Sequence, residues 1–71
     1  MSLDWSDIEE IAERLADTHL EVNPLTIRFT DLLRWIVELE DFDGDPKSSD
    51  EKKLEAVQMA WYEEWKARDS R

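Results

Sequence analysis

The chain has 71 residues, a formal net charge of −10 and no cysteine, and 41% of its residues are hydrophobic. This length and composition predict one small folded domain over residues 1–71, and the lack of cysteine excludes disulfides, thiolate metal sites and cysteine nucleophiles. The strong negative charge argues against nucleic acid and anionic membrane surfaces as partners, and it favours a basic protein or a cation.

The start of the chain carries no recognisable export signal. The run SLDWSDIEE after Met1 lacks both a basic start and an apolar segment. No apolar run in the chain approaches the roughly 20 residues that a membrane-spanning helix needs. We therefore expect a soluble, cytoplasmic domain.

The first predicted helix covers about residues 7–18. Ser6 and Glu9 have the S-x-x-E spacing of a capping box. The single histidine, His19, follows this helix and is interpreted as a partly exposed surface residue. Apolar side chains recur along the helix at helical spacing, at Ile8, Ile11, Ala12 and Leu15.

The second predicted helix opens at Thr30, a good N-cap residue, and stops near Glu40. The Asn23-Pro24 pair before it indicates a turn, after which the chain forms a short extended piece or a single helical turn. A wide apolar face predicts that this is the central and most buried helix, and it comprises Leu32, Leu33, Trp35, Ile36, Val37 and Leu39.

The loop after the second helix alternates aspartates at Asp41, Asp43 and Asp45. An EF-hand loop that began at Asp41 would need glycine at its sixth position and glutamate at its twelfth, where this chain has Pro46 and Lys52. The EF-hand interpretation therefore fails. Weak binding of a hydrated divalent cation such as ferrous iron, a docking surface for another protein, and a solvated acidic turn all stay open.

The third predicted helix begins near residue 50, with either Ser48 or Asp50 as its N-cap. Its apolar stripe is formed by Leu54, Val57, Trp61 and Trp65, with Ala56 and Ala60 permitting close approach of another helix. Trp5 is expected to cover one end of the core. Trp65, near the end of the chain, is a candidate interface anchor, with Met59 and Tyr62 as weaker candidates. The prediction is an all-α domain of three helices.

An enzymatic role is not expected. The sequence lacks a nucleophile–histidine–carboxylate set and a glycine-rich phosphate loop. A three-helix domain of this size has little room for a desolvated cleft that could tune paired carboxylates. No catalytic residue is therefore assigned.

The acidic residues are concentrated in two stretches. Residues 4–21 hold seven acids against one base, Arg14, and residues 38–51 hold seven more against Lys47. Fourteen of the nineteen acids thus lie where only two bases oppose them, and such self-repulsion lowers stability. Either a function maintains this charge, or it only keeps the surface soluble.

Four runs together resemble the IscX family of bacterial iron–sulphur cluster assembly proteins, and the likeness extends from about Leu3 to Trp65. The runs are WSDIEEIAERLAD (5–17), NPLTIRFTDL (23–32), RFTDLLRWIVELEDFDGDP (28–46) and DEKKLEAVQMAWYEEW (50–65). The matching motif positions include Asp31, Trp35, Asp41, Phe42, Asp45 and Pro46. Gly44 departs from the pattern, because the family more often has an acidic residue there, and this weakens the case for a metal site in the loop.

The resemblance implies a modified winged-helix domain that binds the cysteine desulfurase IscS through an acidic face, at a site shared with bacterial frataxin. It also implies weak iron binding by surface carboxylates. We accordingly predict an acidic adaptor, monomeric and without a tightly bound cofactor, that docks on a basic patch of IscS; the alternative is a carrier of ferrous iron. The predicted docking residues are Glu9, Glu13, Asp17, Asp31, Asp41, Asp43 and Asp45, and the last three are also the predicted iron ligands.

Overall fold

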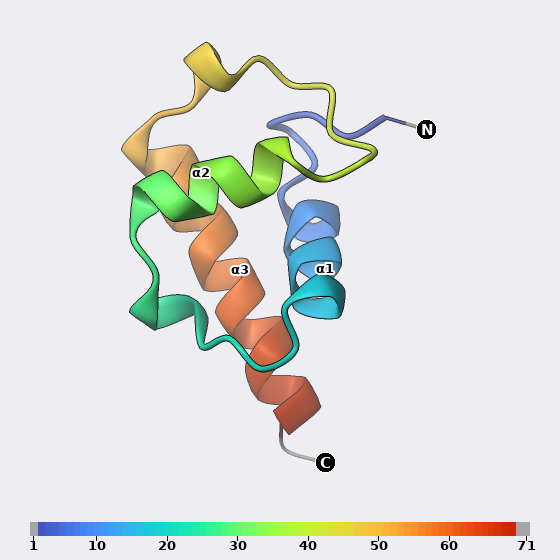
Figure 1. Cartoon of the computed structure of the whole chain (residues 1–71), viewed down its shortest axis with the longest axis vertical. Coiled ribbons are helices and arrows are strands. Elements are labelled where there is room, and N and C mark those ends of the chain that lie inside the picture. Colours follow the sequence, from blue (N-terminus) through green and yellow to red (C-terminus); the bar gives the residue numbers. More distant parts are fainter. Residues whose placement is uncertain (1, 70–71) are drawn as a thin grey trace.

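The computed structural model describes residues 2–69, which form three α-helices and two single-turn 3-10 segments (Figure 1). Residues 2–69 contain no strand, only an isolated parallel bridge between Leu3 and Phe42. The all-α prediction is confirmed, whereas the winged-helix detail stays a prediction. No helix of the described chain is long and apolar enough to cross a membrane. In chain order the elements are α1 (Ile8–Thr18), η1 (Pro24–Thr26), α2 (Phe29–Val37), η2 (Pro46–Ser48) and α3 (Glu51–Asp69).

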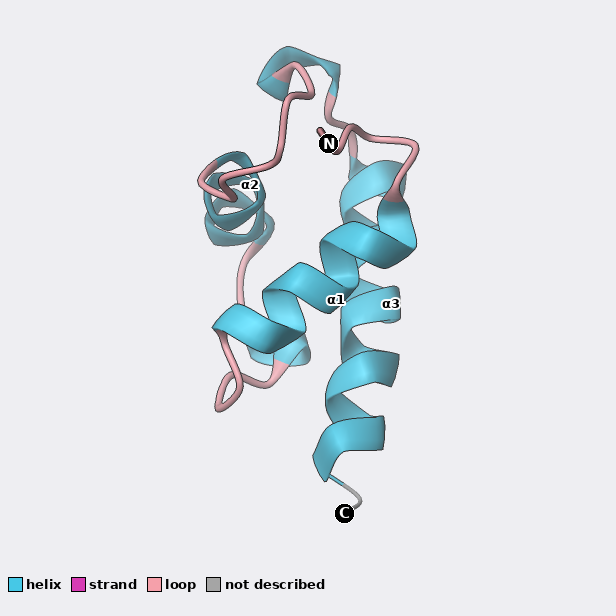
Figure 2. Ribbon diagram, turned by 90° about the vertical axis from the view of Figure 1, so that its right-hand side faces the viewer, coloured by secondary structure: helices cyan, strands magenta, loops and turns pink. Residues whose placement is uncertain are grey.

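The core lies where α1 and α3 pack against each other and α2 crosses them (Figures 1 and 2). Each helix contributes side chains with 0% exposure, including Leu15 from α1, Ile36 from α2 and Trp61 from α3. Burying an aliphatic or aromatic side chain of this size stabilises the fold by about 1.5–3 kcal/mol. The buried hydrophobic residues are Leu3, Trp5, Ile11, Ala12, Leu15, Ala16, Leu32, Ile36, Leu54, Val57 and Trp61.

The prediction that the second helix is the most buried one is wrong. α2 has two buried residues, Leu32 and Ile36, whereas α1 has four. The reason is that α2 ends at Val37, short of the predicted Glu40, and crosses the pair formed by α1 and α3. Its wide apolar face is therefore only partly covered, and Val37 is left 39% exposed.

The predicted helix starts hold to within one or two residues, but two of the predicted caps are wrong. The N-cap of α1 is Asp7 rather than Ser6, because Asp4 Oδ1 accepts the Ser6 amide at 2.8 Å and the Ser6 hydroxyl at 2.5 Å. α2 starts at Phe29, directly after Arg28, so Thr30 lies inside the helix. For α3 the alternative cap is confirmed, since Asp50 Oδ1 accepts the Lys53 amide at 2.8 Å.

The connector between α1 and α2 forms a single turn, which is one of the two predicted forms. The carboxamide oxygen of Asn23 accepts the Leu25 amide at 3.0 Å and so caps η1. η1 is tied to α3 because the Gln58 side-chain amide donates to the Pro24 carbonyl at 2.9 Å. The connector that leads into α2 is therefore anchored on α3.

Candidate acidic docking surface

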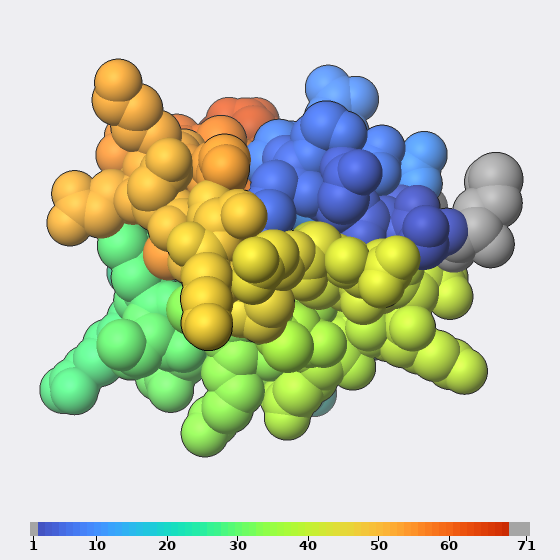
Figure 3. All heavy atoms as spheres, turned by 90° about the horizontal axis from the view of Figure 1, so that it is seen from above, coloured from blue at the N-terminus to red at the C-terminus, as the bar shows by residue number. Residues whose placement is uncertain are grey.

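The 41–45 loop is held by the N-terminal segment of the chain. The Leu3 amide donates to the Asp41 carbonyl at 2.6 Å, and the Asp43 amide donates to the Leu3 carbonyl at 2.7 Å. The indole Nε1 of Trp5 donates to the Asp45 carbonyl at 2.8 Å, which confirms that Trp5 covers one end of the core. Figure 3 shows the two segments side by side on one face of the molecule.

Two of the three loop aspartates have internal partners for their carboxylates. Asp41 Oδ2 lies 2.6 Å from Arg14 Nη1 on α1. Asp45 Oδ1 accepts the Lys47 amide at 2.9 Å and thereby caps η2. Asp43 is exposed, and among the described residues only its backbone is hydrogen-bonded. The alternation of aspartates that resembles a metal loop thus includes an ion pair and a helix cap.

Gly44 allows the ring of Phe42 to fold over the loop. A Cβ atom at position 44 would lie 2.6 Å from Phe42 Cζ, closer than side-chain atoms approach one another. The ring packs edge-on against Trp5, with centroids 5.0 Å apart. An acidic residue at position 44, as in the family pattern, would therefore require the Phe42 ring to shift.

No group of three or more histidine, aspartate or glutamate side chains in residues 2–69 is arranged to hold a metal ion. Asp41, Asp43 and Asp45 are accordingly not brought together as a preformed metal site. Weak ferrous binding at this loop stays a prediction.

A second acidic feature lies between α1 and α3. A groove of about 300 Å³ is lined by Glu9 and Glu13 from α1 and by Ala60, Glu63 and Glu64 from α3. These five residues, called the acidic groove below, include four carboxylates and no base. Within residues 2–69, one of these carboxylates forms an ion pair, that of Glu64 with Arg68 at 3.9 Å, and the other three form neither a hydrogen bond nor an ion pair. The groove therefore presents negative charge that its own lining does not neutralise.

Sequence reasoning identified the α1 half of the acidic groove but missed Glu63 and Glu64. They lie three and four residues after Ala60, on the same face of α3, so the close approach that Ala60 permits places them opposite α1. That spacing was visible in the sequence. What the sequence did not specify was which face of α3 meets the acidic side of α1.

Asp17 continues the Glu9 and Glu13 face of α1 by one more turn, but it has a partner within the chain. Its carboxylate accepts a hydrogen bond from the Arg68 guanidinium on α3. That bond raises the pKa of Arg68 above its ordinary value, and the charges of Asp17, Glu64 and Glu13 add to the effect. Asp17 is therefore neutralised in part by its own chain.

Asp31 lies in the first turn of α2 and pairs with Arg34 at 3.6 Å. The seven predicted docking residues thus occupy three places in the fold. Glu9, Glu13 and Asp17 lie on one face of α1, Asp31 lies on α2, and Asp41, Asp43 and Asp45 lie in the loop.

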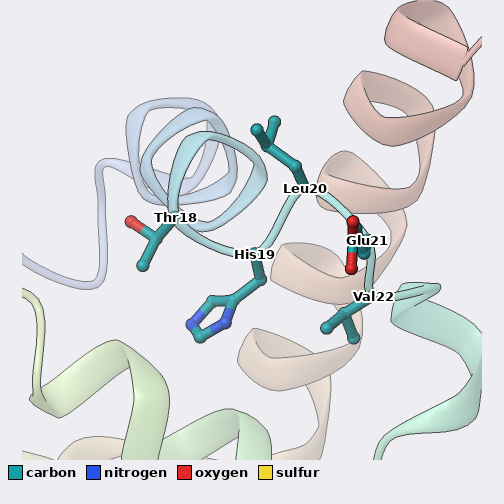
Figure 4. A pocket seen from close by; sticks show the side chains of 5 residues that line it. All are labelled: Thr18, His19, Leu20, Glu21 and Val22. Carbon is teal, nitrogen blue, oxygen red and sulfur yellow. The ribbon is translucent and has the colours of Figure 1, made fainter.

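The turn after α1 contains an aromatic contact that the sequence did not predict. His19 is half-buried, as predicted, and its side chain turns toward α2 from a hollow lined by residues 18–22 (Figure 4). The imidazole stacks on Trp35, with ring centroids 4.1 Å apart and planes 13° apart. Burial lowers the pKa of His19, and the charge of Glu38 acts in the opposite direction. His19 therefore contributes to the packing of α1 on α2.

Comparisons with known proteins agree with the sequence resemblance. A protein-family model described as iron-sulphur cluster assembly matches residues 3–66. An uncharacterized protein of Pseudomonas aeruginosa is 53% identical over 64 residues, which span 90% of this chain and 97% of that protein. The family match covers all of the described helices except the last residues of α3.

Proposed function

The chain belongs to the IscX family of iron–sulphur cluster assembly, and we propose that it acts there as an acidic adaptor that binds a cysteine desulfurase. In this role it is a cytoplasmic monomer that regulates the rate of cluster building and catalyses no step itself. It docks on a basic patch of the desulfurase IscS and competes there with bacterial frataxin.

The observation that carries the proposal is the acidic groove. Four carboxylates from two helices gather in one hollow, and their mutual repulsion lowers the stability of the free protein. Lysine or arginine side chains of a partner relieve that repulsion when they enter the groove. Charge complementarity of this kind raises the association rate and selects basic partners over acidic ones.

The remaining predicted docking residues contribute unequally. Asp41 is already paired with Arg14, and Asp17 with Arg68. A partner that bound either carboxylate would have to compete with the arginine of this chain. Asp43 is exposed and its carboxylate has no such competitor in the described residues. We therefore assign the largest share of docking to the acidic groove, and a smaller share to Asp43.

The test is a binding titration of the protein against a cysteine desulfurase at 50, 150 and 300 mM salt. Screening reaches about 10 Å at 0.1 M salt and shortens as salt rises, so the affinity of an electrostatic complex should fall steeply over this range. The double variant Glu9→Gln/Glu13→Gln should bind more weakly and with a shallower salt dependence.

A matched control for this titration is Glu40→Gln/Glu55→Gln, which removes the same charge from exposed residues outside the groove. The control should lose less affinity than the groove variant. Equal losses would mean that only net charge matters. An affinity that does not depend on salt would contradict electrostatic docking altogether.

The alternative proposal is that the chain carries ferrous iron as cargo. Carboxylate oxygens suit hard and borderline cations, but here Asp41 and Asp45 would have to leave their present partners to share one ion with Asp43. With one equivalent of Fe(II), a carrier should show NMR line broadening confined to a few carboxylate residues. Broadening spread over every acidic residue would instead favour the adaptor.

A further inference from the structure

An apolar hollow lies next to the acidic groove, toward the C-terminal ends of α1 and α3. It has a volume of about 210 Å³ and is lined by Ala16, Leu20, Trp65 and Arg68. Since a water molecule occupies roughly 30 Å³ of liquid, this space is large enough for one apolar side chain. The four residues are called the apolar hollow below.

Leu20 is the most exposed large hydrophobic residue of the described chain, at 63%. Its side chain points away from the His19 ring, and so away from the contact with α2 (Figure 4). Trp65 is half-buried and stacks on Tyr62 with ring centroids 6.1 Å apart. The hollow thus combines an exposed aliphatic side chain with Trp65 and Arg68, and tryptophan and arginine are residue types enriched at the energetic centres of interfaces.

The apolar hollow is continuous with the acidic groove through charged residues. Arg68 lines the hollow and pairs with Glu64, which lines the groove. Arg68 also bonds Asp17, one turn after Glu13 on α1. An apolar centre beside a rim of charged groups is the usual arrangement of a protein–protein interface.

The charge around the hollow decides between possible occupants. A second copy of this chain would bring another net charge of −10 and a second acidic groove against the first. An anionic lipid surface is repelled for the same reason. A basic segment is attracted, because its lysine or arginine side chains can enter the groove while an apolar neighbour enters the hollow.

We propose that the apolar hollow receives one apolar side chain of a basic protein segment whose lysine or arginine residues occupy the acidic groove. This inference rests on the proposed function, because it takes that segment to be part of the desulfurase surface. It adds an apolar contact that electrostatic docking alone does not include. The groove then supplies attraction and orientation, and the hollow supplies resistance to dissociation.

The experiment is a titration of the full chain against a cysteine desulfurase with the variant Leu20→Ser. Affinity should fall about five- to tenfold, while the dependence on salt stays that of the wild type, because no charge has changed. The matched control is Leu25→Ser, which alters another exposed leucine that lines neither the groove nor the hollow. Its affinity should stay within about twofold of the wild type.

A second measurement follows the indole N–H signal of Trp65 by NMR, assigned with the variant Trp65→Phe. The signal should shift when the desulfurase is added. Wild-type affinity of Leu20→Ser together with an unmoved Trp65 signal would overturn the inference, and the proposed function would still stand if the groove variant binds weakly.

Failure of the wild-type chain to bind the desulfurase would overturn the proposed function, and the inference with it. Sedimentation of the free protein tests the other possible occupant of the hollow, a second copy of this chain. A wild-type dimer that Leu20→Ser converts to a monomer would overturn the inference in favour of self-association.

Discussion

The 41–45 loop and the acidic groove are both rich in carboxylates, yet they are built in opposite ways. In the loop, Asp41 is paired with Arg14, Asp45 caps η2, and the backbone is bonded to Leu3 and Trp5. In the groove, the pairing of the carboxylates is limited to Glu64 with Arg68 among the described residues. Two of the three loop carboxylates are therefore used by the fold itself, whereas three of the four groove carboxylates have no hydrogen-bond or ion-pair partner within residues 2–69.

The largest expected effect tests whether the loop is structural. Trp5→Ala removes a buried ring, its hydrogen bond to Asp45 and its edge contact with Phe42. The free energy of unfolding should fall by about 3–5 kcal/mol, enough to unfold much of so small a domain. Urea denaturation followed by circular dichroism measures this loss. A variant as stable as the wild type would mean that the N-terminal segment does not hold the loop.

The next prediction compares the contributions of two loop aspartates to stability, and its expected effect is smaller. Asp45→Ala removes the cap of η2 and should lower the free energy of unfolding by about 1 kcal/mol. Asp43→Ala should change it by less than about 0.5 kcal/mol, because the Asp43 carboxylate has no partner within residues 2–69. Comparing the two urea midpoints provides the test. Equal losses would show that the cap observed at Asp45 contributes nothing specific.

The acidic groove should respond with the opposite sign. Glu13→Gln removes a repulsive i,i+4 neighbour of Glu9, so the free energy of unfolding should rise by about 0.2–0.5 kcal/mol at low salt. The gain should shrink at 1 M salt, where screening weakens the repulsion in the wild type. Glu40→Gln serves as the control for net charge. A loss of stability in Glu13→Gln would indicate that the groove carboxylates stabilise the fold.

The sequence predicted the fold well because three amphipathic segments are separated by strong turn signals. The stripe of Ile11, Leu15 and their neighbours needed no tertiary information to be recognised. The two main errors in the fold prediction have local causes: a competing hydrogen bond before α1 and the early end of α2. The Ser6 hydroxyl, which the capping pattern predicted as the N-cap of α1, donates a hydrogen bond to Asp4 instead. The early end of α2 leaves Val37 exposed.

The candidate site could be predicted only in part. The acidic side of α1 is visible as a periodic pattern, and the aspartates of the loop are visible as an alternation. The sequence does not say which carboxylates meet across helices, because the crossing of α1 and α3 decides that. The Arg14–Asp41 pair joins residues that are remote in the sequence, and no spacing rule predicts it.

The smallest expected effect concerns His19, which lies in neither acidic region and is the only histidine of the chain. Histidine is the side chain whose ordinary pKa lies closest to neutral pH. The folded pKa of His19 lies below the ordinary value of 6.5, so the unfolded chain binds more protons near that pH. The stabilising contribution is therefore complete above pH 6.5 and is lost as pH falls through the folded pKa. His19→Gln should flatten this part of the stability curve, measured as urea midpoints between pH 7.5 and 5.5. If the variant keeps the same dependence of stability on pH, the carboxylates and not His19 cause it.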